Sequence, residues 1–353
     1  MIKKEIKENI GLILLDRPKQ LNAINYIMLE EIKEALDEFK DNQSIRAVLI
    51  DSKAPKGLCA GGDLKEIYED YLLNDEENKK DEFFKKEFEL DSFIKDFPKP
   101  VISHWFGVVM GGGNGLTINS DLIIADETVN WAMPETGLGF TPDVGMGKYI
   151  AKLPQSLGQY VGLCGISLES SDLKKQDLAH ILIDSKDYDK ILEILFDLSK
   201  EYEGEKLIQE FREKVKDFSK DTKTTKIDEN KEKIKEHFSK ESFEDIVKSL
   251  EKDDSNFAQN TLDILKKRDP FMLTVQFEKY FLCKDLSYDE VLDLDLKIIN
   301  YAIKKGSLKE GIRTQMIDKE DEPSWPVEFL DHVDIREVKD LLGIDETYKE
   351  SLK

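Results

Sequence analysis

Two carboxylates, Glu135 and Asp143, occupy the positions in this sequence that best suit acid/base chemistry. Each directly follows a proline, in Met133-Pro134-Glu135-Thr136 and in Pro142-Asp143-Val144-Gly145. The connecting segment is rich in glycine and is flanked by apolar residues that could shield both side chains from water. Because loss of water raises the pKa of a carboxylate, a shielded pair can include a general base that works at neutral pH. The residue types alone leave a pair of exposed turn acids as the alternative.

Two glycine-rich segments could supply backbone donors to such chemistry. The first is Leu58-Cys59-Ala60-Gly61-Gly62-Asp63-Leu64 and the second runs from Met110 to Gly115, each after an apolar, strand-like segment. Bare backbone there can direct N–H groups at a developing oxyanion, which is worth about 3 to 4 kcal/mol per donor in acyl transfer. A tight turn from strand to helix is the alternative. Neither segment fits a dinucleotide-binding G-x-G-x-x-G unit or a P-loop, so hydride transfer and nucleotide hydrolysis are disfavoured.

The elements that must position these segments follow an α/β pattern. Short apolar runs alternate with helical stretches up to about residue 190, which predicts an α/β layered domain. An amphipathic helix is expected over 25–39, and another helix from Leu116. The strand candidates are 10–15, 47–50, 101–103 and 122–125.

The second half of the chain has a different composition. From about residue 200 to 265 it is rich in Lys and Glu, with apolar residues every three or four positions, which is typical of helices with one solvated face. Asp269-Pro270 breaks this pattern, helical spacing resumes over 275–304, and Gly306 stands in a C-cap position. We therefore expect a core over 1–200 and a helical C-terminal region over 201–353.

Composition limits the partners and the compartment. The net charge is −22, from 52 Lys and Arg against 74 Asp and Glu, which argues against nucleic acid or an anionic membrane as partner. Cys59, Cys164 and Cys283 are widely spaced and lack any C-x-x-C companion, so we expect reduced thiols and no metal site. The N-terminus lacks the pattern of a signal peptide, and no segment reaches roughly 20 apolar residues. These features predict a cytoplasmic protein.

Four motifs in order make the sequence recognisable. They are C-A-G-G-D at 59–63, M-G-G-G-x-G at 110–115, M-P-E-T at 133–136 and P-D-V-G at 142–145. With Asp16-Arg17-Pro18 near the start and Pro323-Ser324-Trp325 near the end, the chain resembles the crotonase, or enoyl-CoA hydratase/isomerase, superfamily. The resemblance implies the crotonase fold, a spiral of ββα units, followed here by the helical C-terminal region. It also implies that 1–200 is an acyl-CoA-binding core.

The resemblance assigns roles to the two glycine segments. In crotonases the oxyanion hole uses the N–H of the residue before the aspartate of the first motif, here Gly62, and of the middle glycine of the second, here Gly112. Coenzyme A lies against the first motif in this superfamily. The residues expected to bind the acyl-CoA substrate are therefore Ala60, Gly61, Asp63 and Leu64. No cofactor is implied beyond the coenzyme A that the substrate carries.

The acid/base positions favour one branch of the superfamily. Hydratases carry a glutamate two residues after the triple glycine, where this chain has Gly115. Their second glutamate matches Glu135, and Asp143 stands where the hydrolases have an aspartate. The likeness is therefore closest to the branch that hydrolyses 3-hydroxyisobutyryl-CoA in valine breakdown. It implies an acyl-CoA thioester hydrolase in which Glu135 attacks the carbonyl or activates water, and Asp143 assists water or proton transfer.

Further positions keep two interpretations each. Glu87 matches by spacing a glutamate that the hydrolases associate with the substrate hydroxyl, but an exposed acid on a charged helix is the alternative. His104-Trp105 could line the pocket, whereas His180, His237 and His332 match no catalytic position. At the level of function, the alternatives are an enoyl-CoA hydratase/isomerase with altered acid/base groups and a non-catalytic assembly protein of the same fold. The sequence leaves open the acyl group and whether the chain forms a homo-oligomer.

Overall fold

The computed structural model of the chain describes residues 1–73, 79–319 and 321–344. The chain packs as two units that are interleaved in sequence. The first comprises Met1–Asp63, Lys86–Ala132 and Ser167–Asp228, and the second comprises Leu64–Lys85, Met133–Ile166 and Glu229–Lys353. The bounds of these packing units differ from 1–200 and 201–353. Those two ranges remain a prediction for the acyl-CoA-binding core and the helical C-terminal region.

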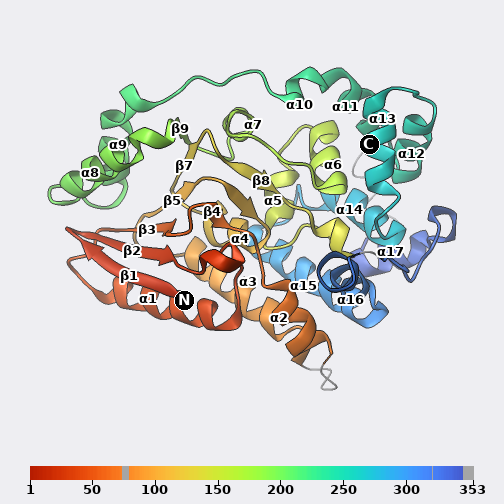
Figure 1. Ribbon diagram of the computed structural model, residues 1–353, viewed down its shortest axis with the longest axis horizontal. Helices are drawn as coiled ribbons and strands as arrows, with labels where there is room; N and C mark the ends of the chain where they lie inside the picture. Colours follow the sequence, from red (N-terminus) through yellow and green to blue (C-terminus); the bar gives the residue numbers. More distant parts are fainter. Residues whose placement is uncertain (74–78, 320, 345–353) are drawn as a thin grey trace. The chain divides into compact units, whose positions relative to one another are not determined.

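The described strands all lie in the first unit, where they form two sheets (Figure 1). The larger sheet has the order β1-β2-β3-β5-β7-β9, with β1 antiparallel to β2 and all other neighbours parallel. The smaller sheet has the order β4-β6-β8 and is parallel. From β3 to β8 the chain therefore alternates between the sheets, as the predicted spiral of ββα units requires.

The bounds of the strands differ between the two sheets. The larger sheet contains β1 (Ile2–Lys7), β2 (Ile10–Leu15), β3 (Ala47–Ser52), β5 (Val101–Trp105), β7 (Leu122–Asp126) and β9 (Ile181–Ile183). The smaller sheet contains β4 (Gly57–Cys59), β6 (Val108–Met110) and β8 (Asn130–Ala132). The carboxyl ends of β4 and β6 lead directly into the two glycine segments.

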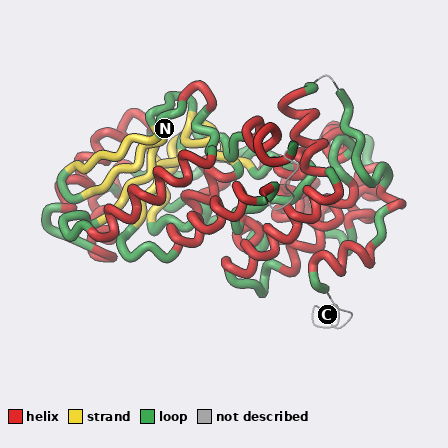
Figure 2. The backbone as a smooth tube through the Cα atoms, turned by 90° about the horizontal axis from the view of Figure 1, so that it is seen from below, coloured by secondary structure: helices red, strands yellow, loops and turns green. Residues whose placement is uncertain are grey.

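Helices cover both faces of the larger sheet, whose strands are yellow in Figure 2. On one face, Leu12, Leu49 and Ile124 pack against Leu195 and Phe211, which come from two helices that follow β9. On the other face, Gly11 lies against the ring of Phe39 from the first helix. The helices of this unit are α1 (Tyr26–Asp41), most of α3 (Glu82–Lys95), α4 (Gly112–Ile118), α7 (Ser170–Lys175), α8 (Tyr188–Ser199), α9 (Gly204–Lys214) and the start of α10 (Lys226–Glu229).

The second unit consists of helices around a core of leucine, isoleucine and phenylalanine side chains. They are α2 (Leu64–Glu66), α5 (Met146–Ile150), α6 (Gln155–Cys164), α11 (Lys231–Phe238), α12 (Phe243–Glu251), α13 (Asn256–Leu265), α14 (Pro270–Leu282), α15 (Tyr288–Lys305), α16 (Ser307–Ile312) and α17 (Ile335–Leu342). The helical C-terminal region is thus confirmed. Among the described residues, no helix combines the length and the apolar character that a membrane crossing needs.

Short helical turns connect these elements. Turns of 3₁₀ type occupy Pro18–Gln20, Glu135–Leu138, Ser185–Asp187, Lys216–Phe218 and Leu330–His332, and π-helical turns occupy Ile67–Leu72 and Arg313–Ile317.

The structure confirms the four predicted strands and the amphipathic helix, but it corrects two helix predictions. Helix α4 begins at Gly112 and not at Leu116, so the second glycine run itself forms the first helical turn. The segment 275–304 is two helices rather than one, because α14 ends at Leu282 and Ser287 caps the start of α15. Gly306 closes α15 with a φ of 89°, as its predicted C-cap position requires.

Gly11 offers a test of how α1 packs on the sheet. A Cβ at this position would lie 2.6 to 2.8 Å from three carbons of the Phe39 ring. Since a buried ring cannot yield freely, Gly11→Ala is expected to lower the free energy of unfolding by about 1 to 3 kcal/mol. The double variant Gly11→Ala/Phe39→Leu should lose less than the sum of the single variants in urea denaturation. Strict additivity would show that the two residues do not touch.

Candidate active site

The first unit brings the two glycine segments side by side. They follow the parallel neighbours β4 and β6, in which Cys59 pairs with Val109. Gly61 has a φ of 96°, and a Cβ on it would lie 3.3 Å from Met110 O and 3.5 Å from Gly112 N. A side chain at position 61 would therefore separate the segments, and glycine allows their backbones to approach closely. The two glycine segments therefore lie close enough to present backbone groups to one bound molecule.

Both predicted oxyanion-hole donors have an N–H group without a protein acceptor among the described residues. At Gly62 the reason is the bridge to Ile24, in which Ile24 N donates to Gly61 O and Asp63 N donates to Ile24 O. These bonds use the Gly61 carbonyl and the Asp63 N–H, so the N–H of Gly62 itself points away from Ile24. At Gly112 the reason is its place at the start of α4, where N–H groups have no intrahelical partner. Two backbone donors are thus available in adjacent loops.

The loop that carries Gly62 is held by an earlier turn of the chain. Asn22 is fully buried, and its amide Nδ2 donates to Leu58 O at 2.7 Å and to Ser52 Oγ at 2.7 Å. Arg17 Nη1 lies 2.7 Å from Asp63 Oδ2. Arg17 and Asn22, from the turn that begins with Asp16-Arg17-Pro18, therefore fix the conformation of the first glycine segment.

The other predicted substrate-binding residues divide between the units. Ala60 and Gly61 lie in the first unit beside Gly62, whereas Leu64 begins α2 in the second. Glu87 is buried on α3, so the alternative of an exposed acid is wrong. A Cβ on Gly112 would overlap the carboxylate of Glu87, which places this carboxylate directly against the second donor loop.

The second unit contains both predicted acid/base residues. Glu135 opens a 3₁₀ turn after Pro134, and Asp143 precedes α5; they are only 3% and 5% exposed. The alternative of exposed turn acids is therefore contradicted. Oε2 of Glu135 is buried and has no hydrogen-bond partner among the described residues. This oxygen is free to accept a proton from a bound molecule.

Two cations and a carboxylate from the C-terminal helices surround the pair. Arg268 donates to Thr136 Oγ1, next to Glu135, and to Cys164 O at 2.6 Å. Lys279 Nζ on α14 donates to Pro142 O at 2.5 Å, next to Asp143. Sequence reasoning missed Arg268, Lys279 and Asp295, the last of which pairs with Lys279 on α15. The segment Leu273 to Leu282 gave no clear signal, because Gln276 and Glu278 interrupt its apolar residues as Lys279 does.

The environment raises both pKa values. Burial raises the pKa of Glu135 well above its ordinary value, and the neighbouring charge of Asp143 raises it further, while Lys279 and Arg268 oppose the rise. Burial raises the pKa of Asp143 to about 8, with a contribution from the charge of Asp295 and opposition from Lys279. Because both pKa values are raised, the pair can keep a proton that exposed carboxylates would lose, and it can therefore include a proton donor.

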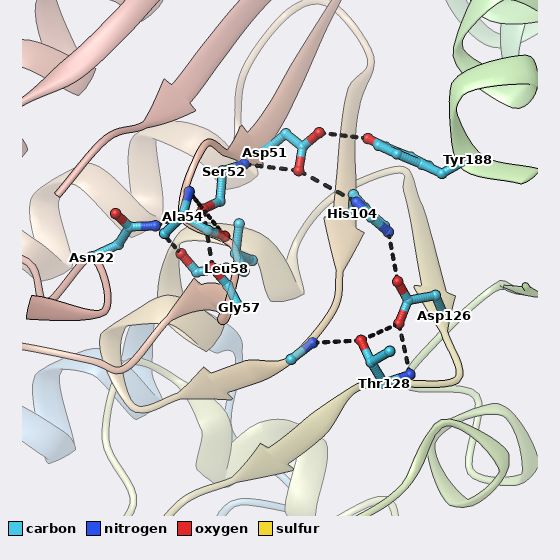
Figure 3. Close-up of polar contacts among 11 residues, drawn as sticks. Asn22, Asp51, Ser52, Ala54, Gly57, Leu58, His104, Asp126, Thr128 and Tyr188 are labelled. Atoms are coloured by element: carbon cyan, nitrogen blue, oxygen red, sulfur yellow. Dashed lines mark hydrogen bonds and ion pairs between the residues drawn. The ribbon is translucent and has the colours of Figure 1, made fainter. Parts of the chain in front are cut away.

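His104 lies in a separate buried network of the first unit (Figure 3). Its ring is stacked on Tyr188, with Nδ1 at 3.3 Å from Asp51 Oδ1 and Nε2 at 3.5 Å from Asp126 Oδ2. Burial is the largest single influence on the pKa of His104 and lowers it. The hydrogen bonds and charges of Asp126 and Asp51 together outweigh burial, so the pKa is raised overall. These contacts tie β3, β5 and β7 to the start of α8 and assign His104 a structural place.

One group of side chains has the composition of a metal site. Glu236, His237 and Asp253 could each offer one ligand atom. However, Lys233 Nζ lies 2.8 Å from Asp253 Oδ2, and His237 Nε2 lies 3.0 Å from the same oxygen. The carboxylate is thus already neutralised by a cation, and the group resembles a hydrogen-bonded ion pair.

Comparison with known proteins identifies relatives along nearly the whole chain. The chain is 30% identical over 326 residues to 3-hydroxyisobutyryl-CoA hydrolase, mitochondrial, of Xenopus laevis, covering 92% of this chain and 83% of that protein. It is 29% identical over 328 residues to the protein of the same name from Homo sapiens, covering 91% and 83%.

Solved structures show the same fold. A carnitinyl-CoA dehydratase from Mycobacterium thermoresistibile matches with a TM-score of 0.86 and 26% identity, and an enoyl-CoA hydratase from Rhodobacter sphaeroides with 0.86 and 27%. Each match covers 97% of this chain and 96% of the other. The family model described as Enoyl-CoA hydratase/isomerase matches residues 10–342. The chain therefore belongs to the enoyl-CoA hydratase/isomerase family and has the crotonase fold.

Proposed function

We propose that this chain hydrolyses a short 3-hydroxyacyl-CoA thioester, with 3-hydroxyisobutyryl-CoA as substrate and 3-hydroxyisobutyrate and coenzyme A as products. The observation that carries the proposal is the buried pair of Glu135 and Asp143, in which Glu135 Oε2 is free to take a proton. The names of the relatives from Xenopus laevis and Homo sapiens support the same reaction. Such a reaction is a step of valine breakdown.

In the proposed reaction the thioester carbonyl accepts hydrogen bonds from Gly62 N–H and Gly112 N–H. As water or Glu135 adds to the carbonyl carbon, negative charge develops on the oxygen, and these preorganised donors stabilise it. Their close spacing in adjacent loops supports this role. The substrate supplies the coenzyme A, and the proposed mechanism uses no metal or prosthetic group.

The two carboxylates divide the proton transfers. Glu135 either attacks the carbonyl carbon or removes a proton from the attacking water, and both routes need its ionised form. Asp143 in its protonated form donates to the leaving thiolate sulfur as the C–S bond breaks. If Glu135 attacks, water then hydrolyses the acyl-Glu135 anhydride; if Glu135 activates water, that water has already been used. In both routes a proton finally passes from Glu135 to Asp143, so the net reaction consumes one water and releases one carboxylic acid and one thiol.

A hydratase is the second candidate, since solved structures with this fold include an enoyl-CoA hydratase and a carnitinyl-CoA dehydratase. It predicts loss of enoyl absorbance when the protein meets crotonyl-CoA. Gly115 argues against this reaction, because it leaves no carboxylate where the hydratases have their first glutamate. A non-catalytic assembly protein would bind no acyl-CoA in calorimetry and would release no thiol.

Thiol release from 3-hydroxyisobutyryl-CoA tests the proposal. Glu135→Gln and Asp143→Asn preserve shape but remove the base and the acid, so each is expected to lower kcat by about 10² to 10⁴-fold. Asp172→Asn is the matched control, since Asp172 is a buried carboxylate of the first unit that accepts from Thr225. This control should keep wild-type activity. Wild-type rates in both active-site variants would refute the assignment.

Glu87→Gln tests recognition of the substrate hydroxyl. A hydrogen bond from the 3-hydroxyl to a carboxylate is worth about 1.5 to 3 kcal/mol, so kcat/KM for the 3-hydroxyacyl substrate should fall about 10 to 100-fold. The value for butyryl-CoA, which lacks the hydroxyl, should stay nearly constant. Glu89→Gln on the same helix is the control, because the Glu89 side chain is 70% exposed. An equal loss for both substrates would assign Glu87 to the scaffold instead.

Thermal unfolding tests the burial of Asp143. Its pKa in the folded state is about 8 against an ordinary 3.8, so the folded state binds the extra proton between these values and loses stability as pH rises through that range. Asp143→Asn removes this loss. The variant should unfold at nearly the wild-type temperature at pH 4 and several degrees higher at pH 8. A destabilised variant at pH 8 would contradict the assigned burial.

A further inference from the structure

The turn that carries Asp143 has a backbone that its sequence does not favour. Val144 has a φ of 49° and Gly145 a φ of 74°, and both residues are buried. Left-handed φ values are easy for glycine but rare for a β-branched residue such as valine. Some other part of the structure must therefore hold Val144, and with it the neighbouring Asp143, in this conformation.

Two C-terminal helices provide the holding contacts from either side. On α14, Lys279 Nζ donates to Thr141 Oγ1 at 3.1 Å and to Pro142 O at 2.5 Å. On α15, Asp295 Oδ2 accepts from Gly145 N at 2.9 Å. The hydroxyl of Tyr288, also on α15, donates to Val144 O at 3.0 Å. The two residues on either side of Asp143 thus each make a bond to one of these helices.

The two charged anchors also neutralise one another. Lys279 Nζ lies 2.5 Å from Asp295 Oδ1, and these side chains are only 1% and 0% exposed. A buried ion pair is costly to desolvate, and well-packed apolar residues in its place are often at least as stabilising. The gain in stability alone therefore does not explain why a charged pair is buried here. The hydrogen bonds that the pair makes to the Asp143 turn do explain it.

The charges around the two carboxylates are few. The charges of Lys279 on α14 and Asp295 on α15 act on Asp143. The charge of Asp143 in turn acts on Glu135 in the 3₁₀ turn. The charge of Arg268 acts on Glu135. Arg268 directly precedes Asp269, which is the N-cap of α14. Because these sites are buried, a change of one charge there is only weakly screened by water or salt.

We propose that the buried ion pair of Lys279 and Asp295 is a positioning element of the active site, which holds the strained turn of Asp143 and balances the charge beside it. The inference rests on the proposed function in one respect: it takes Asp143 to be the proton donor. Lys279 alone would favour the ionised form of Asp143, and Asp295 opposes that effect. Burial keeps Asp143 protonated, and the pair fixes the direction in which it donates without adding a net charge beside it.

The charge effect can be measured without any substrate. Asp295→Asn keeps an oxygen that can accept from Gly145 N but removes the negative charge, so Asp143 should ionise at a lower pH. The gain in unfolding temperature that Asp143→Asn gives at pH 8 should then shrink by at least about half in the Asp295→Asn background. An equal gain in both backgrounds would overturn the charge-balancing role. This result does not depend on whether the chain hydrolyses thioesters.

The positioning effect is measured by thiol release. Lys279→Met removes the bonds to Thr141 and Pro142, so kcat should fall about tenfold to 100-fold with KM within about threefold, as expected for a misplaced catalytic group. Lys99→Met is the control, because Lys99 donates to Phe39 O and Asn42 O at the end of α1, outside the proposed site. It should lower the unfolding temperature without changing kcat. Equal losses of kcat in both variants would show that Lys279 only stabilises the fold and does not position Asp143.

The two measurements separate the possible failures. If the wild-type chain releases no thiol but the unfolding data show the coupling of Asp143 and Asp295, the proposed function is wrong and the charge-balancing role stands. If thiol release depends on Glu135 and Asp143 while Asp295→Asn changes neither the unfolding data nor the pH dependence of kcat, the inference is wrong and the function stands.

Discussion

Removal of Glu135 and Asp143 from water is the constraint on which the rest of the second unit depends. An ionised carboxylate in an apolar interior is costly, so the fold must supply compensating charge or let the group keep its proton. This unit does both. Arg268 and Lys279 face the pair, and the raised pKa values leave a proton within it. The proposed division of the pair into one acid and one base depends on this burial.

The first unit meets a different constraint, which is close approach of backbone to backbone. Oxyanion stabilisation needs N–H groups that no other acceptor takes, and two neighbouring loops can present them only if side chains stay out of the way. Gly61 satisfies this requirement beside Met110, and the bridge from Ile24 to Gly62 uses the flanking groups instead of the Gly62 N–H. The sheet serves to end β4 and β6 at the same edge, where these loops begin.

Sequence patterns predicted the elements whose signals are local. The strand β2 and the helix α1 show clear runs and spacing over enough residues to be distinctive. The strands β4, β6 and β8 have three residues each, too few for any period to show, and β1 is a largely exposed edge strand without an apolar alternation. The start of α4 at Gly112 was missed because glycine disfavours helix interiors, although the first turn tolerates it when a close approach demands it.

The carboxylates were predictable but their electrostatic partners were not, for a physical reason. Glu135 and Asp143 lie in one short segment with proline and glycine markers, so local sequence identifies them. Lys279 and Asp295 meet the Asp143 turn only through tertiary packing, from positions more than 130 residues away in the chain. On its own helix each is one charge among several, with Glu278 beside Lys279 and Asp293 near Asp295, so the sequence does not show which charges are buried. The burial of a charge and its compensation are therefore both properties of the fold.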